Sequence, residues 1–169
     1  MTDILLEIRG LRLEGKSDEK WNPIINGVDM TLKKGEVLGL IGESGAGKST
    51  LGLAAMGFCR DGVRISAGSV NFDGIDLLNA SAALKRSLLG KRIAYVAQSA
   101  AASFNPAHRI IDQHVEGPTQ HRVMSRVESE ADGMALYEKL RLPDPDKIGF
   151  RYPHQVSGGQ LQRAMTAMA

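Results

Sequence analysis

The segment Gly42-Glu43-Ser44-Gly45-Ala46-Gly47-Lys48-Ser49, followed by Thr50, sets the architecture and the chemistry of this chain. It fits the pattern G-x-x-x-x-G-K-[ST], whose glycines let successive backbone N–H groups curl around phosphate oxygens with no Cβ in the way. The Lys48 ammonium supplies charge to the β- and γ-phosphates, and the Ser49 hydroxyl is placed to ligate Mg²⁺. The predicted contacts to ATP or GTP are Gly42, Glu43, Ser44, Gly45, Ala46, Gly47, Lys48, Ser49 and Thr50.

The residues on either side of this loop argue against a chance glycine-rich turn. Val37-Leu38-Gly39-Leu40-Ile41 is apolar without alternation, which is typical of a parallel strand covered on both faces. Residues 48–56 have the character of a helix. The order strand, Gly-rich loop, helix is the context in which the pattern binds phosphate. A second buried strand is predicted at Ile93-Ala94-Tyr95-Val96.

Strands of another kind are predicted near the N-terminus. Apolar residues alternate with polar ones over 6–13 and again over 28–32, as in antiparallel strands with one face in water. A further short strand is predicted at 69–72, where the turn Asp73-Gly74 ends it.

The middle of the chain is predicted to be mostly helical. Residues 82–89 and 161–169 favour helices, and Ser125 with Glu128 three residues later forms a capping box at the start of a longer one. This longer helix is expected to direct these apolar residues into a core: Val127, Ala131, Ala135, Leu136 and Leu140.

The composition is that of an ordinary globular protein. The chain has 169 residues, 43% apolar and 24% charged, and a net charge of +2 is too small to predict a nucleic-acid partner. Cys59 is the only cysteine, which excludes an internal disulfide. No stretch approaches the roughly 20 apolar residues of a membrane span. We therefore expect a cytoplasmic protein whose membrane role, if any, comes through a partner.

A second small-residue loop lies far downstream. Val156-Ser157-Gly158-Gly159-Gln160-Leu161-Gln162-Arg163 combines a hydroxyl, two glycines and a helix start, which are the parts of an anion cradle. Taken alone, the segment fits a helix cap preceded by a turn equally well. The phosphate loop upstream favours the anion cradle.

With both loops in view, the sequence resembles the nucleotide-binding subunits of ABC transporters. The L-S-G-G-Q signature of that family is complete here except that Val156 replaces Leu. The resemblance implies that four residues contact the ATP of a neighbouring subunit: Ser157, Gly158, Gly159 and Gln160. Gln98, which follows the strand predicted at 93–96, is similar to the family's Q-loop glutamine, which meets Mg²⁺ and the attacking water. Trp21 resembles the aromatic residue that stacks on adenine, with a core tryptophan as the alternative.

Two strings narrow the resemblance to oligopeptide, dipeptide and nickel importers. Residues 98–106, QSAAASFNP, are similar to the Q-D-P-x-x-S-L-N-P segment of that group, with Ser99-Ala100 in place of Asp-Pro. Residues 151–159, RYPHQVSGG, match its R-Y-P-H-Q-L-S-G-G string except at Val156. We assign His154, inside that string, a structural role.

The resemblance implies an α/β fold with a P-loop NTPase-type core, an antiparallel β subdomain and a helical subdomain. Residues 1–98 and 156–169 would form the ATP-binding core with the β subdomain, and residues 99–155 the helical subdomain. Lys48 and Gln98 would be catalytic, Ser49 and Gln98 would hold Mg²⁺, and ATP would be the nucleotide. In that family, a strand ending in Asp-Glu and then a switch histidine follow the signature helix. Neither feature occurs before Ala169, where the sequence stops in the middle of a predicted helix. We therefore expect a truncated core and a 169-residue chain that hydrolyses ATP poorly or not at all.

The implied partners are a second ABC ATPase subunit, identical or related, and membrane permease subunits, with a periplasmic solute-binding protein acting indirectly. The location would be the cytoplasmic face of a bacterial inner membrane, and the cargo a peptide. Three alternatives stay open: an importer of nickel or another small solute, a soluble ABC protein of repair or translation, and a non-catalytic ATP-binding module.

Overall fold

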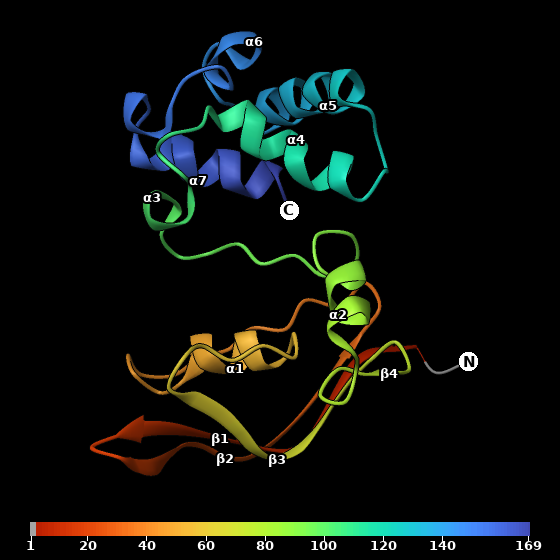
Figure 1. Ribbon diagram of the computed structural model, residues 1–169, viewed down its shortest axis with the longest axis vertical. Helices are drawn as coiled ribbons and strands as arrows, with labels where there is room; N and C mark the ends of the chain where they lie inside the picture. The colour runs from red at the N-terminus through yellow and green to blue at the C-terminus, as the bar shows by residue number, and fades with distance from the viewer. Residues whose placement is uncertain (1–2) are drawn as a thin grey trace. The chain divides into compact units, whose positions relative to one another are not determined.

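The computed structural model describes residues 3–169, which divide into two compact units at residues 85 and 86. Figure 1 shows antiparallel strands with a short helix in the first unit, and helices in the second. The antiparallel β part and the helical part predicted from the sequence are both confirmed.

The first unit is built on one antiparallel sheet with the strand order β2-β1-β3-β4. Its strands are β1 (Ile4–Ser17), β2 (Lys20–Lys33), β3 (Val63–Phe72) and β4 (Ile75–Asp76). Ile8 of β1 pairs with Met30 on one side and Val70 on the other. Ile8 and Val70 are fully buried, so the alternation in the sequence marks the covered face of the sheet.

A bulge interrupts the middle of this sheet. The register of β1 shifts between Ile8 and Leu11 against β2, and it shifts in the same region against β3. Opposite the bulge, a Cβ on Gly68 would lie 2.6 Å from the Leu11 Cα, so the two backbones approach too closely for any side chain there. Gly68 has φ +99°, which also favours glycine.

Helix α1 (Lys48–Ala54) follows the phosphate loop, and α2 (Ala82–Leu88) begins after β4. Leu51, Leu53 and Ala54 of α1 are buried. The loop before α1 contacts β2, because a Cβ on Gly47 would lie 3.0 Å from Ile25 Cδ1. The phosphate loop is therefore packed against the antiparallel sheet within this unit.

Both predicted parallel strands are absent from the structure. Residues 36–43 have no strand pairing, and Val37 and Ile41 are 95% and 99% exposed. Residues 94–96 are also unpaired, with a single bridge from Ile93 to Leu89. An apolar run needs a neighbouring strand on each side to form a buried parallel ladder. Within residues 3–169, no segment supplies that ladder to residues 37–41.

The second unit consists of α3 (Ala100–Ser103), α4 (Ile110–Gln120), α5 (Arg126–Lys139), α6 (Pro145–Ile148) and α7 (Gly158–Ala167), with a 3₁₀ turn at Pro153–Gln155. They surround one apolar core. Its members are Ala100, Phe104, Ile110, Ile111, Val115, Tyr137, Leu142, Ile148, Leu161, Ala164, Met165 and Ala167.

Helix α5 begins at the predicted capping box, but it buries a different face from the one expected. Ser125 accepts a hydrogen bond from the Glu128 N–H, and the Glu128 carboxylate accepts one from the Ser125 N–H. Val127, however, is 77% exposed, and Ala131 and Ala135 also face solvent. Only Leu136 and Leu140 of the predicted set pack against the core.

The face that α5 buries is formed by Ser129, Gly133 and Tyr137. Gly133 gives room to the His114 ring of α4, because a Cβ there would lie 3.2 Å from two of its atoms. The Tyr137 hydroxyl and His114 Nδ1 are 3.2 Å apart, and the two rings meet edge to face. The prediction was wrong because a glycine and two polar side chains line this contact, which an apolar pattern does not reveal.

Candidate nucleotide-binding site

The phosphate loop is closed on itself by its own lysine. The Lys48 ammonium donates hydrogen bonds to the Gly42 carbonyl at 2.7 Å and to the Glu43 carbonyl at 2.5 Å. The Ala46 N–H donates to the Glu43 carbonyl at 3.2 Å, which forms a tight turn between them. Gly45 and Gly47 have φ values of +85° and +81°, and the backbone would be strained there if the residue carried a side chain. The segment is thus a compact loop with the lysine head over its backbone.

The start of α1 leaves hydrogen-bond donors for an anion. Gly47 is the N-cap and has no side chain to accept the first N–H groups of the helix. The N–H groups of Lys48, Ser49 and Thr50 have no partner within the helix, because the first intrahelical hydrogen bond runs from the Leu51 N–H to the Gly47 carbonyl. Within α1, the first turn holds no acidic residue. This donor set fits a phosphate group.

The same residues fit a magnesium ion that is held mainly by nucleotide oxygens. Mg²⁺ keeps several waters and takes one or two protein ligands besides phosphates. Ser49 offers an exposed hydroxyl in the first turn of α1. Glu43, the only carboxylate inside the loop, is exposed.

Trp21 lies at the surface and not in a core. It is 37% exposed near the end of the β1–β2 hairpin, where it pairs with Lys16. The Arg64 guanidinium carbon lies 4.2 Å from the centre of its ring, a cation–π contact. The alternative of a core tryptophan is therefore wrong. Stacking on adenine stays a prediction.

The signature loop begins α7 as a capping box. Ser157 Oγ accepts a hydrogen bond from the Gln160 N–H, and Gln160 Oε1 accepts one from the Ser157 N–H. The prediction that this segment caps a helix is therefore correct. Binding of an anion stays possible as well, because a hydroxyl that accepts one hydrogen bond still has its own hydrogen to donate. Gly158 and Gly159 are exposed in the first turn.

The start of α4, just after the string 98–106, pairs with residues 149–151, where the string 151–159 begins. The Ile110 N–H donates to the Arg151 carbonyl at 3.0 Å, and the Ile111 N–H donates to the Gly149 carbonyl at 2.7 Å. The rings of Tyr152 and His154 stack, with centroids 5.7 Å apart. Gln98 is exposed just before α3. The structure thus places Lys48, Ser49 and Trp21 in the first unit, and Gln98 and Ser157 in the second.

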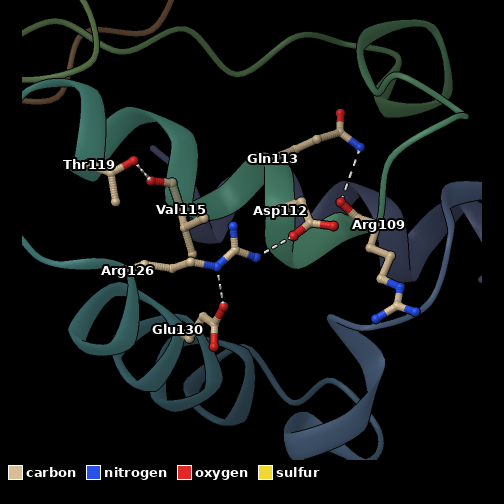
Figure 2. Close-up of polar contacts among 7 residues, drawn as sticks. All are labelled: Arg109, Asp112, Gln113, Val115, Thr119, Arg126 and Glu130. Atoms are coloured by element: carbon tan, nitrogen blue, oxygen red, sulfur yellow. Dashed lines mark hydrogen bonds and ion pairs between the residues drawn. The ribbon is translucent and has the colours of Figure 1, made fainter.

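A polar groove of about 540 Å³ lies on the second unit beside the string 98–106. Figure 2 shows Arg126 of α5 reaching both Asp112 of α4 and Glu130 of its own helix. Gln113 fixes the loop before α4 by donating to the carbonyls of Asn105, His108 and Arg109. The groove is lined by Asn105, His108, Asp112, Gln113, Val115, Glu116, Thr119 and Arg126.

Across residues 3–169, no helix is both long enough and apolar enough to cross a bilayer. The same part of the chain holds no group of three His, Cys, Asp or Glu residues arranged to bind a metal ion.

Comparison with known proteins assigns the family, since residues 25–169 match the ABC transporter family. The chain belongs to the ABC transporter family. This ABC protein is 34% identical over 167 residues to the oligopeptide transport ATP-binding protein OppD of Salmonella typhimurium. It is also 34% identical over 165 residues to the dipeptide transport ATP-binding protein DppD of Haemophilus influenzae. These alignments cover 99% and 98% of the chain but 50% of each relative, so it spans about half the length of the curated relatives it matches.

Solved ABC cassettes have the same fold. The dimeric structure of MJ0796, described as a bacterial ABC transporter cassette, superposes with a TM-score of 0.83 at 20% identity. A dimeric post-hydrolysis state of MJ0796 bound to ADP and Pi gives a TM-score of 0.81. Each match covers 97% of this chain and 68% of the other. The family and the fold class predicted from the sequence are therefore confirmed, and the family is one that binds ATP.

Proposed function

We propose that the chain is the ATP-binding part of a peptide-importer ATPase that works at the cytoplasmic face of a bacterial inner membrane. The observation that carries this proposal is the closed loop at 42–49, with the Lys48 ammonium over its backbone, in a chain of the ABC family. The peptide cargo is supported by relatives named for oligopeptide and dipeptide transport.

The grip on ATP is proposed to come from one loop. A phosphate oxygen replaces the Gly42 and Glu43 carbonyls as the partner of the Lys48 ammonium, because an anion is the stronger acceptor. The free N–H groups at the start of α1 bind further phosphate oxygens. Ser49 and Gln98 are proposed to ligate Mg²⁺, which neutralises phosphate charge when it is bound. Trp21 is proposed to stack on adenine.

The signature loop is proposed to act on the ATP of a second ABC subunit. Ser157 can donate its hydroxyl hydrogen to a phosphate while it still caps α7. Gly158 and Gly159 offer N–H groups with no Cβ to block a ligand. Closure of two such subunits, identical or related, head to tail over ATP would place each signature loop against the other subunit's nucleotide.

ATP hydrolysis by this chain alone is proposed to be slow or absent. Phosphoryl transfer to water requires positioning, charge neutralisation and a group that orients the water. Lys48 and the loop amides supply the first two, and Gln98 is proposed to meet the water. Glu43 is exposed, and residues 163–169 contain no carboxylate.

The polar groove of the second unit is proposed to receive a membrane permease subunit. Asp112, Glu116 and Arg126 give it charges of both signs next to the Gln98 string. A partner segment with polar and basic side chains would complement it. We expect Glu116→Lys to reduce co-purification with permease subunits in membranes, while Glu138→Lys on exposed α5 leaves it unchanged. Equal recovery of both variants would contradict this docking site.

Calorimetry with ATP tests the nucleotide proposal. Lys48→Ala removes charge-assisted hydrogen bonds to phosphate, so we expect a loss of affinity of roughly 10- to 100-fold. Lys33→Ala, at an exposed lysine in the same unit, serves as the matched control and should bind as the unchanged chain does. Unchanged affinity in Lys48→Ala would count against the loop assignment.

A further inference from the structure

One side chain of α7 holds both ends of the segment that carries Gln98. Gln162 Nε2 donates a hydrogen bond to the Ala97 carbonyl at 3.0 Å, and Gln162 Oε1 accepts one from the Ala100 N–H at 3.3 Å. A carboxamide offers a donor and an acceptor side by side, so it can bind two peptide groups at once. Gln98 and Ser99 lie between those two peptide groups and are exposed.

The segment needs such outside support. Helix α3 has only four residues, and its N-cap Ser99 makes no side-chain hydrogen bond to the helix. The N–H groups at a helix start must find acceptors elsewhere, and Gln162 supplies one for Ala100. Ala100 is buried in the core of the second unit, and Ala97 packs against it. The backbone is thus anchored on both sides of an exposed Gln98.

The anchor belongs to the helix that begins with the signature loop. Ser157 caps α7, and Gln162 projects from the same helix. The two polar elements proposed to meet ATP in this unit, the signature loop and the Gln98 segment, are therefore joined through one amide side chain.

We propose that Gln162 is a positioning residue that fixes the Gln98 segment to the signature helix. It acts through Gln98 and not by touching the nucleotide. The inference rests on the proposed function of Gln98, but the anchor itself can be measured without nucleotide.

Amide hydrogen exchange on the full chain tests the anchor. Gln162→Met keeps the length of the side chain and removes both hydrogen bonds, so the Ala100 amide should exchange roughly two- to tenfold faster. Gln162→Glu keeps an acceptor for that N–H and should restore most of its protection. Gln120→Met, at an exposed glutamine of α4, is the matched control and should leave Ala100 unchanged.

The link to Gln98 is tested by the gain in ATP affinity that Mg²⁺ produces, measured by comparing titrations with Mg²⁺ and with EDTA. Gln162→Met should lower that gain roughly two- to tenfold when Gln98 is present and change nothing further in a Gln98→Ala background. A merely structural role would instead lower affinity equally with and without Mg²⁺, and that outcome overturns the proposal. So does an Ala100 amide whose exchange is the same in Gln162→Met.

Failure of the proposed nucleotide function would give a result different from failure of the Gln162 anchor. If the unchanged chain shows no affinity for ATP while the Ala100 amide stays protected by Gln162, the nucleotide function is refuted, and with it the role of the anchor in that function. Protection of Ala100 would then mark Gln162 as a fold determinant only.

Discussion

Lys48 and Ser157 each lie at the start of a helix, and their hydrogen bonds give them different chemistry. Lys48 follows a glycine that cannot cap α1, and its ammonium donates only to carbonyls of the loop. Ser157 caps α7 with its own oxygen. A phosphate is therefore expected to displace existing contacts of Lys48, whereas at Ser157 it would add a contact and leave the cap in place.

Trp21 offers a direct optical probe of the proposed adenine contact, because it is the only tryptophan in the chain. Its ring is half-exposed, with Arg64 over it. We expect saturating ATP to change its fluorescence, and Lys48→Ala to move that change to roughly 10- to 100-fold higher ATP concentration. Fluorescence that stays constant while calorimetry reports saturation would remove Trp21 from the site.

The sequence reveals motif residues well at this scale, and it misses residues that act through the fold. Lys48 and Ser157 stand in recognisable patterns because phosphate chemistry restricts their neighbours. Gln162 stands in mid-helix, where a glutamine reads as a surface residue, and only the fold brings it to Ala97 and Ala100. No pattern in the chain could have indicated that contact.

Among the elements, α5 shows how a helix start can be predicted while its buried face is not. The capping box depends on two side chains three residues apart, so it is local and visible in the sequence. The buried face depends on α4, whose His114 ring fits against Gly133 and Tyr137. Local patterns thus position an element, and its partner decides which side is covered.

The capping box of α5 gives a stability prediction with an internal control. Ser125→Ala removes the acceptor for the Glu128 N–H and should lower the free energy of unfolding by about 1 kcal/mol. Ser99→Ala should have little effect, since the Ser99 side chain makes no cap hydrogen bond. Denaturant titration followed by circular dichroism measures both. Equal losses in the two variants would contradict the capping role of Ser125.

The His114–Tyr137 contact predicts a pH dependence for the helical unit. Burial lowers the pKa of His114 below 6.5, and the charge of Asp132 opposes that shift only in part. The unfolded chain therefore binds a proton more readily than the folded one, so stability is complete above pH 6.5 and declines as pH falls towards the folded pKa.

Urea titrations at pH 7.5 and pH 5 test this dependence. His114→Leu should reduce the difference between the two pH values, whereas His108→Gln, at an exposed histidine, should preserve it. A His114→Leu variant with the same pH dependence as the unchanged chain would exclude His114 as the cause.

At the scale of the whole molecule, the apolar segment at 37–41 is the main departure from the sequence prediction. The run has the composition of a buried parallel strand, yet Val37 and Ile41 are almost entirely exposed. Burial of such a strand depends on neighbours, and in residues 3–169 none pairs with it. The antiparallel sheet was predictable because its strands supply one another.

An exposed segment with apolar side chains and unpaired backbone groups favours association between copies of the chain. Val37→Thr with Ile41→Thr should increase the monomer fraction in analytical ultracentrifugation and leave the thermal midpoint nearly unchanged. Ile8→Thr, in the buried face of the sheet, should lower that midpoint strongly. A loss of stability in the double variant comparable with that of Ile8→Thr would show that residues 37–41 are buried in solution.

The central claim is that the loop at 42–49 grips the terminal phosphates of a nucleotide, and affinities for ATP, ADP and AMP measured by calorimetry test it most directly. We predict that ATP and ADP bind at least about tenfold more tightly than AMP, because each β- or γ-phosphate adds charge-assisted contacts to Lys48 and the loop amides. Lys48→Ala should bring ATP close to the affinity of AMP. Equal affinities for all three nucleotides in the unchanged chain would contradict the claim.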